Sequence, residues 1–271
     1  MGPALGEAWS GFAAHGPMAR SVADVAMMLD VMAGYRVGDP YWAAPPAEPF
    51  AAAARRAPCG LRLALVLEAP RVDTDDEVAA AVEGAACRFE ALGHTVIAAS
   101  PPLDGMADDY GLIFKVGVAG LPLEIITGGE PDEGLLSDWV RWLREEGRRI
   151  GASEYLQAQV RLSARSRALV ASFEEFDALL APTLVRPAQA LDWNPGPFET
   201  VLPEGWFGWL PFTYPFNVTG QPALSIPCGF TRRGLPVGLQ IVGRPGDEAT
   251  ILALAAAYEA SEPWGHRRPA L

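Results

Sequence analysis

The sequence has 271 residues, half of them hydrophobic and a fifth charged, which favours a folded globular protein over a disordered chain. Its formal net charge of −12 argues against a nucleic-acid-binding surface, because a polyanion would be repelled. The chain has no apolar run of about 18 residues, and its three cysteines lack CxxC spacing. We therefore expect no membrane span, no disulfide framework and a reduced, cytoplasmic setting.

The first part of the chain alternates predicted helices and strands. Helical periodicity begins after Ser21, whose hydroxyl can cap the first free amides, and Gly34 can end this helix. Residues 37–56, rich in proline and alanine, are typical of a long surface loop. A strand, a helix that starts with acidic residues and a second strand are predicted next, over residues 61–67, 73–93 and 94–98. This order is typical of a βαβ unit, so we expect parallel strands with a right-handed crossover.

The second part of the chain is mostly helical in its middle and extended near its end. The predicted elements are two amphipathic helices, a short buried strand, two further strands and a last helix, over residues 135–150, 154–173, 177–181, 223–230, 235–242 and 247–258. The polar turn Thr231–Gly234 separates the last two strands and suggests a hairpin. The sequence therefore predicts an α/β fold, a mixed β-sheet flanked by helices, organised as a single domain over residues 1–271.

The common reactive motifs are missing from the sequence. His15, His94 and His266 show no metal-binding spacing, and there is neither a phosphate-binding glycine loop nor a GxSxG nucleophile motif. We therefore expect no metal ion and no cofactor. His94 follows a glycine at a predicted helix end, where we expect its ring to bond the last carbonyl groups.

Lys115 is the single lysine of the chain, and two interpretations of it are open. As a buried base with a lowered pKa it could activate a serine; as a surface or snorkelling lysine it would have no catalytic role. No recognisable serine partner lies nearby in the sequence, which favours the second interpretation. The acidic pairs Asp75–Asp76 and Asp108–Asp109 fall at predicted helix starts, where carboxylates interact favourably with the helix dipole, so we expect them to be structural.

Several short segments of the sequence carry motifs that are more specific than a fold alone requires. Gly16–Ala26 reads GPMARSVADVA, Pro215–Pro227 reads PFNVTGQPALSIP, and Gly234–Gln240 reads GLPVGLQ. Together with DALLAPT at Asp177–Thr183, these runs resemble, in the same order, segments of the amidase-signature enzymes. Pro263–Trp264 and Arg267–Pro269 in the tail, with Arg36–Asp39 near the start, are similar to segments of the branch with the 6-aminohexanoate cyclic-dimer hydrolases and related bacterial amidases. The resemblance implies an incomplete amidase-signature fold that comprises its carboxy-terminal part.

The resemblance also implies a mechanism. In the family a Ser–Ser–Lys triad hydrolyses the C–N bond of small amides through an acyl-enzyme, and backbone amides form the oxyanion hole. The triad lies before the segment that Gly16–Ala26 matches, and Met1–His15 contain neither of its motifs. We therefore assign no catalytic residue within the chain and expect it to be inactive alone. A truncated product, one piece of a split gene and an incomplete sequence all remain open.

The resemblance places an acyl pocket in the helical middle of the chain. Tyr110 and Phe114 are accordingly the predicted substrate-binding residues, with Trp139 as a further candidate, although aromatic residues at helical spacing are commonly part of a core. A small amide would bind only once an amino-terminal half completes the site. The alternatives are a non-catalytic or split-gene partner subunit, or the A subunit of an aminoacyl-tRNA amidotransferase, which the acidic charge disfavours. Strand edges left open by the missing half predict poor solubility or self-association.

Overall fold

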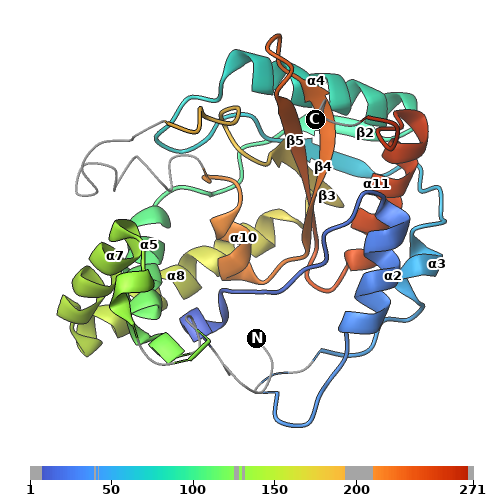
Figure 1. The fold of residues 1–271 in the computed structure, drawn as a ribbon. Coiled ribbons are helices and arrows are strands. Elements are labelled where there is room, and N and C mark those ends of the chain that lie inside the picture. Colours follow the sequence, from blue (N-terminus) through green and yellow to red (C-terminus); the bar gives the residue numbers. More distant parts are fainter. Residues whose placement is uncertain are drawn as a thin grey trace.

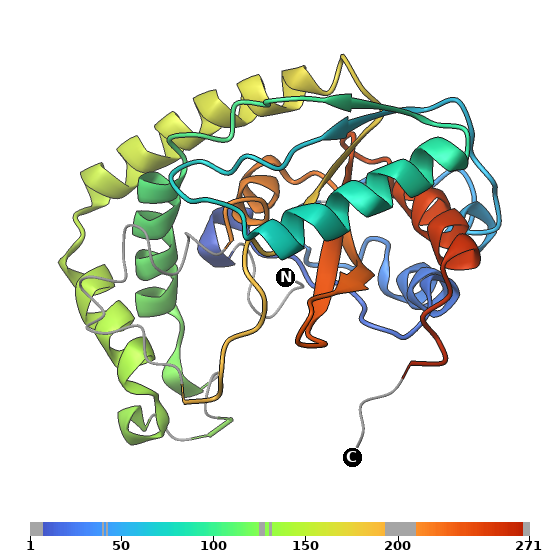
Figure 2. The same cartoon turned by 90° about the horizontal axis from the view of Figure 1, so that it is seen from above.

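The computed structural model describes residues 8–39, 41, 43–124, 128–129, 132–192 and 210–267. Within this part of the chain, five strands form one mixed sheet in the order β2-β1-β3-β5-β4, with helices on both faces (Figures 1 and 2). The strands are β1 (Arg62–Leu65), β2 (Thr95–Ala98), β3 (Ala178–Pro182), β4 (Ala223–Phe230) and β5 (Pro236–Gly243). The predicted α/β class with a mixed sheet is thereby confirmed.

The helices include all those predicted, in the same order, and two short ones that were not predicted. They are α2 (Val22–Met32), α3 (Phe50–Ala53), α4 (Asp76–Ala91), α5 (Ala107–Gly120), α7 (Asp138–Arg149), α8 (Ala152–Ser172), α10 (Tyr214–Thr219) and α11 (Glu248–Ser261), with 3₁₀ turns η1 (Ala8–Gly11) and η2 (Glu133–Leu135). Side-chain oxygens of Ser21, Asp75, Ser137 and Asp247 cap the helices that follow them. No helix in the described ranges combines the length and the apolar character needed to cross a bilayer.

The sheet contains both predicted strand pairs, and β3 joins them. β1 is parallel to β2 and to β3, with Arg62 opposite Thr95 and Leu63 opposite Ala178. β5 is antiparallel to β3 and also to β4, with which it forms the predicted hairpin. Because side chains alternate along a strand, β3 serves two cores: Ala178 and Leu180 pack on one face, Leu179 and Ala181 on the other.

Each face of the sheet has its own helical layer. On one face α2, α4 and α11 enclose a core that includes Phe89, Leu239 and Ile251. On the other face α5, α8 and α10 enclose a core that includes Phe173 and Phe212. α7 packs outside α5, so α5, α7 and α8 form a helical group to one side of the sheet (Figure 1).

The segment predicted as a long loop, residues 37–56, contains a short helix, so that prediction was wrong in part. α3 is fixed by a contact from α2: the Asp30 carboxylate accepts hydrogen bonds from the amides of Phe50 and Ala51, at 2.6 and 3.0 Å. Phe50 is also buried in the core. Both interactions come from residues distant in the sequence, so local composition could not reveal them.

His94 lies where predicted, after α4, but its ring does not bond the helix carbonyls. The backbone amide of His94 donates to the Phe89 carbonyl, while neither ring nitrogen has a hydrogen-bond partner among the described residues. The ring packs edge-on against Phe89 and is 6% exposed. Burial lowers the pKa of His94 from its ordinary value, because the charged imidazolium loses its hydration.

The buried imidazole predicts a pH dependence of stability. Since the folded-state pKa of His94 lies below the ordinary value of 6.5, the unfolded chain binds more protons as the pH falls through that value. We expect the free energy of unfolding to be greatest near neutral pH and to fall below about pH 6.5, the ordinary histidine value. Urea titrations from pH 7.5 to 5 should show a shallower decline in His94→Phe than in the parent chain. An equal decline in both proteins would rule out His94 as its source.

Candidate functional site

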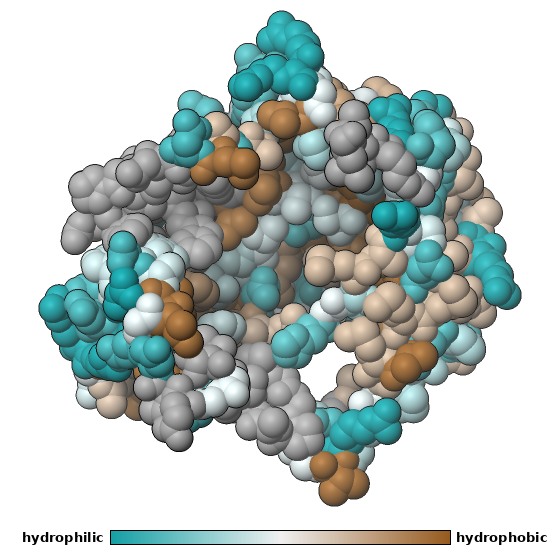
Figure 3. All heavy atoms as spheres, viewed as in Figure 1, coloured by the Kyte–Doolittle hydropathy of each residue, from teal (hydrophilic) through white to brown (hydrophobic). Residues whose placement is uncertain are grey.

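A cavity of about 1000 Å³ opens beside β4. The face of the molecule drawn in Figure 3 is hollowed near its centre. The cavity is lined by most of residues 11–22, by the segment from Gly220 to Pro227, and by Gln240, Trp264 and Arg267. The runs GPMARSV, NVTGQPALSIP and GLPVGLQ all contribute to this lining, although they are far apart in the sequence. We call this space the large cavity.

Three of the runs identified in the sequence meet at Gly238. Thr183, at the end of DALLAPT, and Ser225, in β4, lie on either side of it, with their hydroxyl oxygens 2.6 Å apart. A Cβ atom on residue 238 would lie 2.8 Å from the Thr183 hydroxyl and 3.1 Å from that of Ser225. Glycine at position 238 therefore leaves room for the hydroxyl pair.

Long-range hydrogen bonds from the same runs fix the walls of the large cavity. The amide nitrogen of Asn217 donates to the carbonyl of Phe12, at 2.8 Å. The Trp264 indole donates to the carbonyl of Arg20, at 2.9 Å. The buried Gln240 amide donates to the carbonyl of Phe212. The first two bonds hold the extended segment before α2 against α10 and the tail.

A second, smaller pocket of about 170 Å³ contains both predicted substrate-binding residues. We call it the aromatic pocket, and its lining is Trp9, Phe12, Ala13, Ala14, Tyr110, Ile113, Phe114 and Asn217. Tyr110 stacks on Tyr214 with ring centroids 4.9 Å apart, and Phe114 stacks on Trp9 at 5.7 Å. Trp139 stacks on Trp142 of α7 and lines neither the large cavity nor the aromatic pocket.

Trp9 and Phe12, which also line the aromatic pocket, were not identified from the sequence. Both belong to the segment from η1 toward α2, where no periodic pattern singles them out. Asn217, which lines both the large cavity and the aromatic pocket, links them through its bond to Phe12. Burial raises the pKa of Tyr110, and it raises the pKa of Tyr214 to about 12, so both phenols stay neutral near pH 7.

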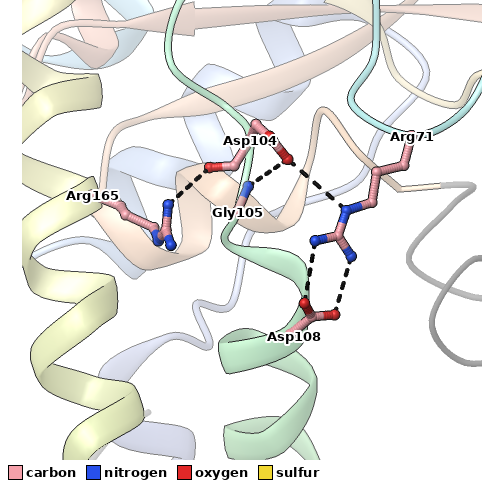
Figure 4. Close-up of polar contacts among 5 residues, drawn as sticks. All are labelled: Arg71, Asp104, Gly105, Asp108 and Arg165. Atoms are coloured by element: carbon pink, nitrogen blue, oxygen red, sulfur yellow. Dashed lines mark hydrogen bonds and ion pairs between the residues drawn. The ribbon is translucent and has the colours of Figure 1, made fainter.

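Two consecutive carboxylates hold the start of α5, the helix that carries Tyr110. Arg71, in the loop after β1, forms a two-pronged ion pair with Asp108, at 3.1 and 3.2 Å, and also faces Asp104 (Figure 4). Asp109, which is buried, receives two donors from Arg161 of α8. The prediction that this acidic pair is structural agrees with these contacts, which place α5 between its neighbours.

Lys115 does not line either site. It lies on α5 with its ammonium nitrogen 5.6 Å from the centre of the Trp142 ring, a cation–π contact with α7. Among the described residues, no group of three or more His, Cys, Asp or Glu could hold a metal ion. The arrangement can supply hydroxyl and backbone groups to a bound molecule, and an aromatic surface for an apolar group.

Comparison with known proteins agrees with this geometry. The family model Amidase matches residues 4–252. The 6-aminohexanoate-cyclic-dimer hydrolase of Paenarthrobacter ureafaciens is 34% identical over 282 residues, which cover 97% of this chain and 56% of the hydrolase. A solved structure of 6-aminohexanoate cyclic dimer hydrolase superposes with a TM-score of 0.81 at 31% identity, covering 93% of this chain and 55% of that one.

A more distant structure shares the fold alone. The glutamyl-tRNA(Gln) amidotransferase structure from Thermotoga maritima superposes with a TM-score of 0.71 at 21% identity, over 92% of this chain and 53% of that one. The chain spans about half the length of the curated relatives it matches, from 48% to 56%. The family match extends over nearly the whole sequence, from the segment before α2 into α11. The chain therefore belongs to the Amidase family.

Proposed function

We propose that this chain is the carboxy-terminal half of an amide hydrolase that cleaves small amides, and that it is inactive alone. The observation that carries the proposal is the convergence of the family-like runs on the large cavity, whose lining includes Ser225 but not Lys115. A serine nucleophile needs a base within hydrogen-bond reach. Lys115, the single lysine of the chain, instead makes a cation–π contact with Trp142, away from the large cavity. The nucleophile and base would come from polypeptide outside the present sequence.

In the completed protein, a serine oxygen would attack the amide carbonyl carbon and form an acyl-enzyme, while the amine leaves with a proton supplied by the catalytic base. Water would then cleave the ester and release the acid. Tyr110 and Phe114 would bind the acyl side of the substrate in the aromatic pocket, whose stacked rings suit an apolar chain or ring.

An amidase assay tests the proposed function. The purified chain should release no ammonia or amine from simple aliphatic and aryl amides above the buffer rate. The chain co-expressed with the region of the Paenarthrobacter ureafaciens hydrolase that lies outside the match should release product. Turnover by the chain alone that disappears in Lys115→Ala would contradict the proposal, because it would make Lys115 the base. A stable complex without turnover would favour the alternative of a non-catalytic partner subunit.

A further inference from the structure

We propose that Arg71 is a positioning residue for the aromatic pocket. Its guanidinium acts through Asp108, at the start of α5, on the orientation of Tyr110, two residues further along the same helix. Arg71 itself lines neither the large cavity nor the aromatic pocket. The inference rests on the proposed function for the use of the pocket, whereas the positioning itself is a property of the chain alone.

The backbone of Arg71 gives the first argument. Pro70 and Arg71 form a tight turn between Ala69 and Val72, which are joined by an isolated antiparallel bridge. Arg71 has a φ of 66°, as at the third position of a type II turn, where glycine is the usual residue. A side chain in this left-handed region is strained, and such residues persist where their surroundings hold them. The guanidinium is therefore held in place at a cost in backbone energy.

The side chain of Arg71 bridges two acidic residues (Figure 4). Its two terminal nitrogens donate to the two carboxylate oxygens of Asp108, at 3.1 and 3.2 Å, and its Nε lies 3.9 Å from Asp104. A planar fork of this kind fixes direction as well as distance. Asp104 is held in turn, because its carbonyl accepts from Arg165 of α8, at 3.5 Å, and its carboxylate accepts from the amide of Gly105. The turn after β1 is thus connected to the start of α5 and to α8.

The first turn of α5 is held from two directions. Consecutive residues of a helix lie about 100° apart around its axis. Asp109 is fixed by Arg161 of α8, and that contact alone would leave the turn free to rotate about it. The pair of Arg71 with Asp108 supplies the second fixed point. Tyr110 is the next residue, so its ring follows any rotation of this turn.

The same charges also act on the ring against which Tyr110 stacks. Tyr214 is buried, and its ring centroid lies 4.9 Å from that of Tyr110. Burial raises the pKa of Tyr214 to about 12, and the charge of Arg71 opposes that rise. Asp104 and Asp108 add to it. Arg71 therefore influences Tyr110 through the helix start and Tyr214 through its charge.

The ion pair is too exposed to contribute much to global stability. The side chains of Arg71 and Asp108 are 40% and 64% exposed, and pairs of this kind are screened by water and salt. Arg71→Gly would remove the pair and also relieve the strained backbone, because glycine adopts a positive φ readily. Positioning and stability can therefore be separated in this variant.

Fluorine NMR of the chain labelled with fluorotyrosine tests the proposal. The sequence contains six tyrosines, and the resonances of Tyr110 and Tyr214 are assigned from their phenylalanine variants. We expect both resonances to shift in Arg71→Gly, while the midpoint of urea unfolding stays unchanged. About 1 M NaCl should shift them in the same direction in the parent chain, because salt screens exposed charges, and should add nothing in Arg71→Gly.

Arg88→Ala is the matched control. It removes the ion pair of Arg88 with Glu262, at 2.7 Å, whose side chains are 44% and 51% exposed, close to the exposure of the Arg71 pair. Arg88 belongs to α4 and lines neither the large cavity nor the aromatic pocket. The resonances of Tyr110 and Tyr214 should keep their positions in this variant.

Turnover in the completed protein gives a second measurement. In the complex with the unmatched region of the Paenarthrobacter ureafaciens hydrolase, Arg71→Gly should raise KM for an aryl amide roughly three- to tenfold, about the contribution of one aromatic contact. The change in kcat should be smaller, because the pocket binds the substrate away from the reacting bond. Arg71→Lys keeps the charge without the planar fork, so it should recover KM only in part.

Four results would overturn the positioning role of Arg71. They are unmoved resonances of Tyr110 and Tyr214 in Arg71→Gly, equal shifts in Arg88→Ala, a lowered urea midpoint in Arg71→Gly, which would make the pair a stability contact, and an unchanged KM in a complex that turns over. Absence of turnover in the parent complex would refute the proposed function alone, and the resonances would still decide the role of Arg71.

Discussion

Replacing Gly147 with alanine is expected to lower the free energy of unfolding by about 3 kcal/mol, at the upper end of the usual range for overpacking. Gly147 is buried in α7, where the helix crosses α5. A Cβ atom at this position would lie 2.2 Å from the carbonyl oxygen of Lys115 and 2.8 Å from the side chain of Ala119. The nearer obstacle is backbone, so the two helices would have to separate.

Separating these helices would also break the cap at the end of α5. The buried Arg144 of α7 donates to the carbonyls of Val118 and Leu121, at 2.8 and 2.9 Å, which would otherwise lack helical partners. Gly84→Ala is the matched control, because Gly84 lies in the interior of α4 and a Cβ atom there would meet none of the described residues within 4 Å. It should stabilise the protein by roughly 0.5–1 kcal/mol through helix propensity. Urea titrations measure the free energy of unfolding of both variants. A stabilising Gly147→Ala would show that the α5–α7 contact is looser than these distances indicate.

The sequence predicted the elements whose signals are local. Ser21, Asp75 and Asp247 each precede an apolar periodic segment, and each caps the predicted helix. The hairpin of β4 and β5 also follows from adjacent residues, since its turn contains Gly234 with a positive φ of 77°. α3 could not be predicted in this way, because the carboxylate of Asp30 that starts it belongs to another helix.

The candidate site likewise contains residues that could be predicted from the sequence and residues that could not. Tyr110 and Phe114 could be selected because the family resemblance places an acyl pocket in the helical middle of the chain, and both line the aromatic pocket. Their role as substrate-binding residues stays a prediction. Trp9 and Phe12 could not be selected, since their position depends on the bond from Asn217 and on space above Gly117. Contacts between residues so far apart along the chain leave no periodic signal in a single sequence.

Gly117→Ala is the second substitution with a large expected effect, because it fills the space that the Trp9 indole occupies against α5. A Cβ atom on residue 117 would lie 1.2 Å from Cδ1 of the Trp9 indole and 2.0 Å from Nε1, so the ring must leave α5. The stack of Trp9 on Phe114 and one wall of the aromatic pocket would be lost with it. We expect a net destabilisation of about 2 kcal/mol, which combines the lost burial of the ring with the gain in helix propensity.

A double-mutant cycle separates the contact with Trp9 from any effect on α5 alone. In a Trp9→Ala background the space above Gly117 is empty, so Gly117→Ala should stabilise the chain by roughly 0.5–1 kcal/mol, as helix propensity alone predicts. The coupling energy between the two positions should then be roughly 2.5–3 kcal/mol. Near-UV circular dichroism should report the loss of the Trp9–Phe114 stack in either single variant. A coupling energy near zero would mean that the indole does not rest on Gly117, and the aromatic pocket would then lack the wall that makes Tyr110 and Phe114 a binding surface.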